Sequence, residues 1–268
     1  MRKKTKLLIS KKKKVFLIIG ILSFLCLLAA IIFLLFYDYY PIESRIDKVS
    51  EYAKKDSDDY TTIGWLRVQG TNIDYPVIYA PSYDFSGMTH DFLWNEVKSD
   101  ELLNQVTVSG HNILNLSTNP LITNKNHKRF EQLMSFVYLD FVKDNKYVQY
   151  TVNGKDYLYK IFSVSFPERS DIEKFTRENL SKKEMREYLD KSIDESIFDF
   201  DIDVNEGDKI LSLVTCTRMF GHYNDIEFRV DARLVRNGEL KSNYDVQKSK
   251  NYHEIEEIMK GGENDEKV

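Results

Sequence analysis

The chain has 268 residues, enough for one sizeable folded domain with accessory segments. Hydrophobic residues make up 42% of it, and with only 11 Gly and 5 Pro it cannot be a fibrous or low-complexity protein. The first 14 residues carry eight basic and no acidic side chains, so the remainder, with 30 basic against 42 acidic side chains, is strongly acidic. This balance argues against nucleic acid as a partner, because affinity for nucleic acid comes from neutralising phosphates.

Residues 15–36 contain no charged side chain. A helix of this length spans about 33 Å, enough to cross a hydrocarbon core of roughly 30 Å. The run is too long for a cleaved signal peptide, whose apolar region has about 7–15 residues. We therefore expect a cytoplasmic basic segment over 1–14 and a transmembrane anchor over 15–37, because basic flanks stay in the cytoplasm. The rest of the chain is then extracellular.

The segment after the anchor is polar and carries apolar residues at helical spacing, which predicts a short helix within a juxtamembrane linker over 38–60. From Thr61 the chain changes to short runs rich in β-branched and aromatic residues. Asn153-Gly154 predicts a two-residue hairpin between two of these runs. The runs predict strands over 63–68, 74–80, 104–110, 146–152, 156–166, 208–216 and 226–236.

Ser181 and Glu184 fit a capping box, and Leu180 with Met185 fits the hydrophobic staple around it, so we expect a helix over 181–193. A second helical stretch is expected over 127–136. The polar, acidic tail over 237–268 is expected to form at most a short helix near 253–260. Together these elements predict one mostly antiparallel β domain over 61–236, a closed or half-closed barrel with peripheral helices.

The cysteines single out one candidate for chemistry. Cys26 lies inside the apolar run and is expected to act as a small apolar residue. Cys216 is the only cysteine on the exported side, so it has no partner for an intramolecular disulfide. It ends the apolar run KILSLVTC, and the end of a strand is where a scaffold presents a reactive group. An inert core thiol in an anchored scaffold or adhesin is the alternative.

The strand after Cys216 carries Arg229 and Arg233 on one face. If residues 217–225 form the connecting loop, Arg229 lies within two or three residues of the thiol. Arg233 is four residues further along, about 13 Å at ~3.3 Å per residue, which is beyond the reach of a guanidinium. The spacing therefore favours Arg229.

A proton carrier is also needed, and His111 follows the apolar run QVTVSG, again at the mouth of the sheet. No pair of histidines has a metal-ligand spacing, and a single exported thiol argues against zinc, so neither a metal nor a cofactor is expected. The other four histidines lie in polar connections or in the tail: His90, His127, His222 and His253.

Taken together, these motifs resemble the sortase family, and most of all its class B members. The family's T-L-x-T-C signature is matched by residues 212–216, with serine at the first position. The G-H-N context of the family's histidine is matched by residues 110–112, and its arginine by Arg229. The segment at 65–77 and the insertion that carries the 181–193 helix are also similar to class B.

The resemblance implies a sortase-like β-barrel that acts as a membrane-anchored extracellular cysteine transpeptidase. It implies Cys216 as nucleophile, His111 as general acid and base, Arg229 as oxyanion stabiliser, and Thr215 and Asn112 as substrate-binding residues. Such an enzyme cleaves a C-terminal sorting motif of surface proteins through a thioester and transfers the acyl group to an amine of the cell wall. A pilin-polymerising sortase is the alternative within the family.

One departure from the family pattern is the gap of thirteen residues between Cys216 and Arg229. The intervening loop contains Arg218, a rival for Arg229, and Asp225, which either orients His111 or is an exposed loop residue. A papain-like peptidase fits less well, because its cysteine precedes its histidine. Here the histidine comes 105 residues earlier.

Overall fold

The computed structural model describes residues 2–36, 42–80, 92–95, 102–116, 126–176, 179–221, 225–239 and 244–265. Within these ranges the side chains of 2–12, 33–36 and 261–265 are left out of the description. The N-terminal helix and the domain that begins at Ile42 are separate units.

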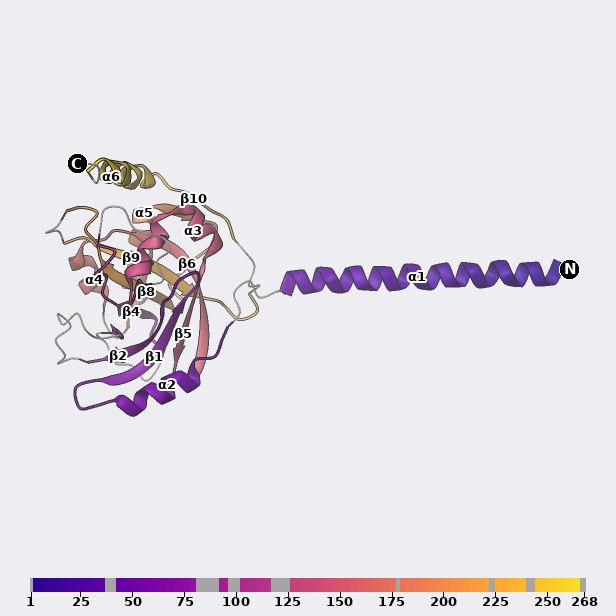
Figure 1. The fold of residues 1–268 in the computed structure, drawn as a ribbon, viewed down its shortest axis with the longest axis horizontal. Helices are drawn as coiled ribbons and strands as arrows, with labels where there is room; N and C mark the ends of the chain where they lie inside the picture. The colour runs from indigo at the N-terminus through magenta and orange to yellow at the C-terminus, as the bar shows by residue number, and fades with distance from the viewer. Residues whose placement is uncertain are drawn as a thin grey trace. The chain divides into compact units, whose positions relative to one another are not determined.

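The N-terminal helix α1 runs over Arg2–Phe36 (Figure 1). Its segment Lys13–Ile32 has 20 residues and a mean hydropathy of 3.1, and none of it is buried against the described protein. A helix that is apolar all round and uncovered by protein is suited to a lipid environment. The prediction of an apolar helix of membrane length is confirmed, and its last predicted residue, 37, lies outside the described residues.

The domain is built on a closed barrel in the order β1-β2-β3-β4-β8-β9-β6-β5 (Figure 1). The pairs β2–β3 and β4–β8 are parallel, and the other neighbours are antiparallel. The prediction of a mostly antiparallel β-barrel with peripheral helices is confirmed. The strands are β1 (Thr61–Val68), β2 (Asp74–Tyr79), β3 (Leu93–Asn95), β4 (Gln105–Ser109), β5 (Tyr147–Val152), β6 (Lys155–Ser165), β8 (Ile210–Cys216) and β9 (Glu227–Leu234).

Side chains alternate between an apolar barrel interior and an outer face. Fully buried residues of seven strands form the interior: Leu66, Val77, Val108, Val148, Ile161, Leu211 and Val230. On β8 and β9 the outer face is largely polar. Here the register sets Ser212 opposite Asp231, Val214 opposite Arg229 and Cys216 opposite Glu227. This row of residues positions the site.

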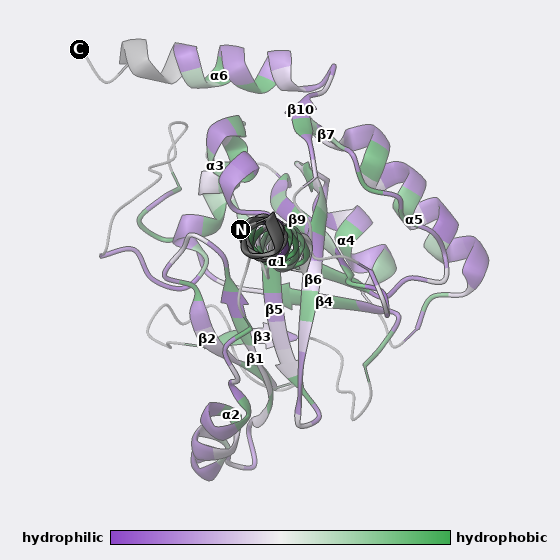
Figure 2. Ribbon diagram, turned by 90° about the vertical axis from the view of Figure 1, so that its right-hand side faces the viewer, coloured by the Kyte–Doolittle hydropathy of each residue, from purple (hydrophilic) through white to green (hydrophobic). Residues whose placement is uncertain are grey.

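The helix α5 (Lys182–Glu195) covers part of that outer face. Its capping box is formed, since the Glu184 amide donates to Ser181 Oγ at 3.3 Å and the Ser181 amide donates to Glu184 Oε2 at 2.8 Å. Buried Met185 and Leu189 pack in a cluster that includes Ile210 of β8. Along α5 hydrophobic residues are interspersed among hydrophilic ones, as expected of a helix lying on a barrel (Figure 2). The predicted cap and helix are confirmed.

The hairpin prediction is also confirmed, because Asn153 and Gly154 join β5 and β6 with φ angles of 53° and 67°, the left-handed pair of a type I′ turn. The helical stretch predicted over 127–136 is a 3₁₀ helix, η2 (Glu131–Val137). The remaining helices are α2 (Ile46–Tyr52), η1 (Ala53–Lys55), α3 (Leu139–Asp144), α4 (Arg169–Phe175) and α6 (Tyr252–Asp265).

The C-terminal segment is more ordered than the sequence predicted. The strand β10 (Val246–Lys248) pairs with β7 (Phe198–Phe200), and α6 has 14 residues instead of the short helix predicted near 253–260. The physical reason is burial, because Tyr252 is 6% exposed and its ring lies 5.3 Å from that of Phe198. From Tyr244 onward the segment is thus part of the domain.

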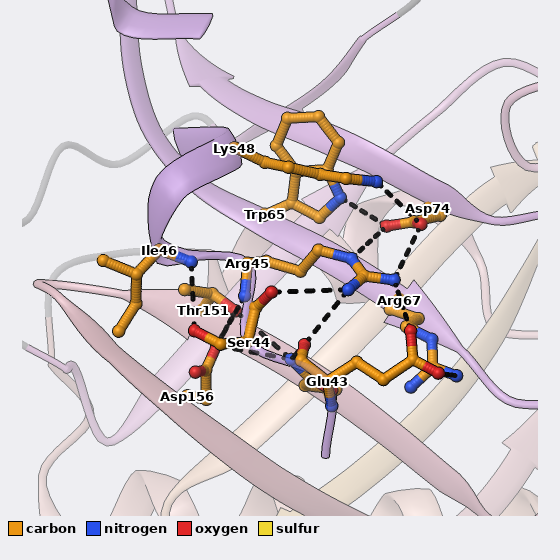
Figure 3. Close-up of polar contacts among 11 residues, drawn as sticks. Glu43, Ser44, Arg45, Ile46, Lys48, Trp65, Arg67, Asp74, Thr151 and Asp156 are labelled. Atoms are coloured by element: carbon orange, nitrogen blue, oxygen red, sulfur yellow. Dashed lines mark hydrogen bonds and ion pairs between the residues drawn. The ribbon is translucent and has the colours of Figure 1, made fainter. Parts of the chain in front are cut away.

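From Ile42 onward the segment after the anchor is likewise part of the domain, and a polar clamp around Arg45 holds it (Figure 3). Arg45 Nε and Nη2 donate to the two carboxylate oxygens of Asp74 at 2.9 and 3.0 Å, and its backbone amide donates to Asp156 at 3.2 Å. Trp65 Nε1 also donates to Asp74, at 2.5 Å. Burial alone would raise the pKa of Asp74, but the hydrogen bonds from Arg45 and Trp65 hold it below its usual value.

Replacing Arg45 by alanine is expected to lower the free energy of unfolding by about 1–3 kcal/mol, because half-buried Asp74 loses a bidentate partner. Urea unfolding of the detergent-solubilised chain measures this through Trp65 and Trp94, both in the barrel. The difference in unfolding free energy between Arg45→Ala and the native chain should be largest at neutral pH. It should shrink as pH falls through the lowered pKa of Asp74, because the protonated carboxyl no longer pairs with Arg45. Lys48→Ala is the control, since Lys48 binds the same carboxylate at 3.2 Å but is 47% exposed. Equal losses for both variants would contradict the clamp.

Candidate active site

The ends of the parallel strands β4 and β8 form the floor of the site. Ser109 at the end of β4 lies beside Val214, and the Gly110 amide donates to the Val214 carbonyl at 3.2 Å. Because parallel neighbours end at the same edge of a sheet, His111 comes to lie at the edge where Cys216 ends β8.

Two side chains fasten these strand ends together. Thr215 Oγ1 donates to the Gly110 carbonyl at 2.7 Å, and Asn112 Nδ2 donates to the Cys216 carbonyl at 2.9 Å. Both side chains are buried. These bonds favour a positioning role for Thr215 and Asn112 over the substrate contacts that the resemblance implied.

Gly110 lets the histidine segment pass close to the core. A Cβ at this position would meet Leu93 Cδ2 at 2.6 Å and Phe130 Cγ at 2.8 Å, which is too close for any other residue. The Phe130 amide donates to the His111 carbonyl at 3.0 Å, and the His111 and Trp94 ring centroids lie 5.1 Å apart. Contacts on both sides therefore fix the position of His111.

A cavity of about 240 Å³ opens over the strand ends, and both Cys216 and His111 line it. The structure thus brings the predicted nucleophile and the predicted proton carrier to one site. The helix α4 contributes lining residues of its own. Besides Cys216 and His111 the lining consists of Trp94, Thr107, Ser109, Gly110, Arg169, Ile172, Glu173, Thr176, Val214, Thr215 and Glu227.

The Cys216 thiol is exposed in this cavity but lies against a carboxylate. Desolvation by the surrounding protein raises its pKa to about 11, and the charge of Glu227 adds to this rise while Arg169 opposes it. The thiol is therefore protonated at neutral pH in the free protein. Reaction requires the thiolate, so a partner such as His111 has to take up the thiol proton.

The Glu227→Gln variant is expected to react at lower pH, because it loses the negative charge that, after desolvation, does most to raise the pKa of Cys216. The second-order rate of alkylation by neutral iodoacetamide, followed from pH 6 to 11, should rise at lower pH in this variant than in the native chain. Glu173→Gln is the matched control, since this carboxylate also lines the cavity. A profile for Glu227→Gln that coincides with the native one would contradict the electrostatic role of Glu227.

Arg229 is not among the residues that line the cavity. It is 2% exposed; its Nε lies 3.0 Å from Asp231 Oδ2, and its Nη2 donates to Ser192 Oγ at 3.1 Å. Its guanidinium also lies over the Tyr188 ring at 5.3 Å. Arg229 lies on the predicted face of β9. α5 covers this part of the face, and Ser192 and Tyr188 of that helix contact the guanidinium.

The arginine that lines the cavity is Arg169, which the sequence interpretation missed. Its Nε and Nη2 contact Glu227 Oε1 at 2.9 and 2.7 Å. The strand register could have indicated such an arginine. It places the Glu227 carboxylate directly opposite Cys216, and a carboxylate that is buried there needs a cation as its partner. Nothing local in the sequence identified α4 as the source of that cation.

The remaining candidates lie elsewhere. Arg218 and Asp225 are exposed and do not line the cavity, and His222 falls outside the described residues. Arg233 is buried and donates to the Asp203 carbonyl at 2.9 Å. Among the described side chains, no group of three or more His, Cys, Asp or Glu is arranged to hold a metal ion.

Known proteins supply independent support for the fold and the family. No family model matches the sequence. Sortase B of Listeria monocytogenes is 23% identical over 181 residues, covering 63% of this chain and 67% of that protein. The X-ray structure of Clostridium perfringens sortase B has a TM-score of 0.56 and 28% identity, over 70% of this chain and all of that one. A Staphylococcus aureus sortase B–substrate complex shares the fold, with a TM-score of 0.53 and 19% identity over 69% and 84% of the two chains.

The solved sortase B structures share the fold that carries the cavity. A cysteine that ends one strand and a histidine that follows its parallel neighbour match the motifs from which the resemblance was drawn. The chain therefore has the sortase B fold and, by its similarity to the sortase B proteins, is a cysteine transpeptidase.

Proposed function

We propose that the protein cleaves a C-terminal sorting motif of surface proteins and joins the acyl part to an amine of the cell wall. The observation that carries this proposal is the shared cavity of Cys216 and His111 in a sortase B barrel. Its partners are surface proteins that bear a sorting signal and a wall precursor that supplies the amine. Polymerisation of pilin subunits follows the same chemistry with a lysine amine and is the second candidate.

The first step forms a thioester. The Cys216 thiol gives its proton to His111, and the thiolate attacks the carbonyl carbon of a threonine, producing a tetrahedral oxyanion. When this species collapses, the carbon–nitrogen bond breaks, and the His111 imidazolium protonates the leaving amine. The peptide C-terminal to the threonine departs, and the protein holds the acyl group on sulfur.

The second step releases the product. An incoming amine attacks the thioester carbonyl, His111 takes up the proton of that amine, and the carbon–sulfur bond breaks. Two solved relatives support both halves of this scheme, since the Staphylococcus aureus protein was solved with a substrate and a sortase B was solved with triglycine. The primary amine of a glycine peptide is the acceptor chemistry that we propose here.

We propose that the helix α1 anchors this reaction at a membrane, because its apolar segment is long enough to cross one. We propose that its basic N-terminal side faces the cytoplasm and the domain lies outside the cell, as the positive-inside rule favours. Anchoring then holds the enzyme where a membrane-bound substrate and a wall precursor meet.

Incubation of the detergent-solubilised chain with peptides of the N-P-x-T-x and x-P-x-T-G kinds tests the proposal. Intact mass should reveal an acyl adduct that appears with release of the C-terminal fragment and disappears when triglycine is added. Cys216→Ala should form no adduct. If no peptide acylates the native chain while wall-anchored proteins persist in cells that lack the enzyme, the proposal is wrong. An adduct resolved only by a lysine-bearing pilin peptide would favour the second candidate.

A further inference from the structure

Arg169 and Glu227 form an ion pair beside Cys216 that takes no part in the two reaction steps proposed above. Glu227 lies directly across the strand pair from Cys216, and its side chain is only 9% exposed. A carboxylate at this place opposes both a thiolate and an oxyanion, because like charges in a desolvated site repel strongly. A cation is needed to offset it.

Arg169 supplies that cation from a rigid position. Its backbone amide donates to the Asp225 carbonyl at 2.7 Å, and the Glu227 amide donates to the Pro167 carbonyl at 2.9 Å. A bridge between Glu168 and the residue before Glu227 completes this short strand-like contact. Residue 169 is therefore fixed to the strand that pairs with Cys216.

The guanidinium of Arg169 keeps one edge open. Nε and Nη2 both contact Glu227 Oε1, at 2.9 and 2.7 Å. Within the described ranges Nη1 has no hydrogen-bond or ion-pair partner, and the side chain is 52% exposed while it lines the cavity. The guanidinium of Arg229, in contrast, is buried among Asp231, Ser192 and the Tyr188 ring.

We propose that Arg169 on α4, and not Arg229 on β9, donates the hydrogen bond that stabilises the oxyanion, and that Glu227 is the positioning residue that holds its guanidinium. This role rests on the proposed acyl transfer at Cys216. A guanidinium suits it because it stays protonated and presents several donors in a plane, so that one edge binds Glu227 while another remains for the substrate. Removal of such a donor is expected to slow acylation by about 10²–10³-fold.

The first test uses two alkylating reagents and no substrate. Iodoacetate and iodoacetamide both form a sulfur–carbon bond with the Cys216 thiolate and release iodide, so their rate ratio does not depend on the thiolate fraction. The carboxylate of iodoacetate stands in for the oxyanion. Arg169→Ala and Arg169→Gln should both lower the iodoacetate-to-iodoacetamide ratio by about tenfold, the loss of one charge-assisted contact. Arg169→Lys should retain part of the native iodoacetate-to-iodoacetamide ratio, because lysine keeps the positive charge.

Arg186→Ala is the matched control, since Arg186 is an ion-paired, exposed arginine on α5 that pairs with Glu206. It should leave the ratio at the native value. Ratios for Arg169→Ala and Arg169→Gln that stay within about twofold of the native ratio would overturn the assignment, since a cation beside the thiol discriminates between a charged and a neutral reagent.

The second test measures single-turnover acylation by any peptide that forms an adduct. Loss of rate in Arg169→Ala with intact folding supports the assignment, and a native rate in that variant overturns it while the proposed function stands. If no peptide acylates the native chain yet the alkylation ratio depends on Arg169, the proposed function fails and the placement of the cation holds. The two failures are therefore distinguishable.

Discussion

Replacing His111 by alanine is expected to slow formation of the Cys216 thioester by about 10²–10⁴-fold, because the variant lacks the group that moves protons to and from the reacting atoms. The raised pKa of Cys216, about 11, makes this dependence strong, since little thiolate forms at neutral pH without a proton acceptor. Intact-mass measurement of single-turnover acylation records the loss directly.

The matched control for this prediction is His253→Ala. His253 is a histidine of α6 whose side chain is 76% exposed and does not line the cavity. The His253→Ala variant should be acylated at the native rate. Imidazole in the buffer should restore part of the rate of His111→Ala, because the shortened side chain leaves space in an open cavity. Acylation of His111→Ala at the native rate would remove His111 from the mechanism.

The strands predicted from the sequence are those with a local signal. β5 and β6 are rich in β-branched and aromatic residues and flank a left-handed turn, so every local feature agrees with the hairpin. β3, β7 and β10 have three residues each and no such pattern. Their pairing depends on distant partners, as when Leu93 of β3 lies beside Val77 of β2, and periodicity cannot report it.

The same limit applies to the site. Cys216 and His111 could be predicted because each lies at the end of an apolar run, and the parallel pairing of β4 and β8 makes the two ends coincide. Arg229 has the expected parity, but parity identifies a face and not what covers it. α5 comes over this face from an insertion that precedes β8, and α4 brings Arg169 to the cavity in the same way.

The position of Arg229 has a large consequence for stability. Asp231 has no exposed surface, and it accepts a hydrogen bond from Tyr188 Oη at 2.6 Å while it pairs with Arg229. Burial by itself lowers the pKa of Arg229, but Asp231, Tyr188 and Glu195 outweigh it and raise that pKa above its ordinary value. The guanidinium thus neutralises a carboxylate that water cannot reach, and it ties α5 to β9 through Ser192.

The Arg229→Leu variant is therefore expected to lose about 3–5 kcal/mol of unfolding free energy, because it leaves the buried charge of Asp231 uncompensated. The double variant Arg229→Met with Asp231→Leu should recover most of this loss, since apolar residues of similar volume can replace a buried ion pair. Urea unfolding followed by tryptophan fluorescence measures both free energies, with Arg186→Leu on the exposed side of α5 as a control that should unfold like the native chain.

The double variant Arg229→Met with Asp231→Leu also separates the roles of Arg229 and Arg169 in catalysis. If it folds and is still acylated within about tenfold of the native rate, the oxyanion donor is a group other than Arg229, since losing the true donor costs about 10²–10³-fold. A folded double variant that cannot be acylated would return that role to Arg229.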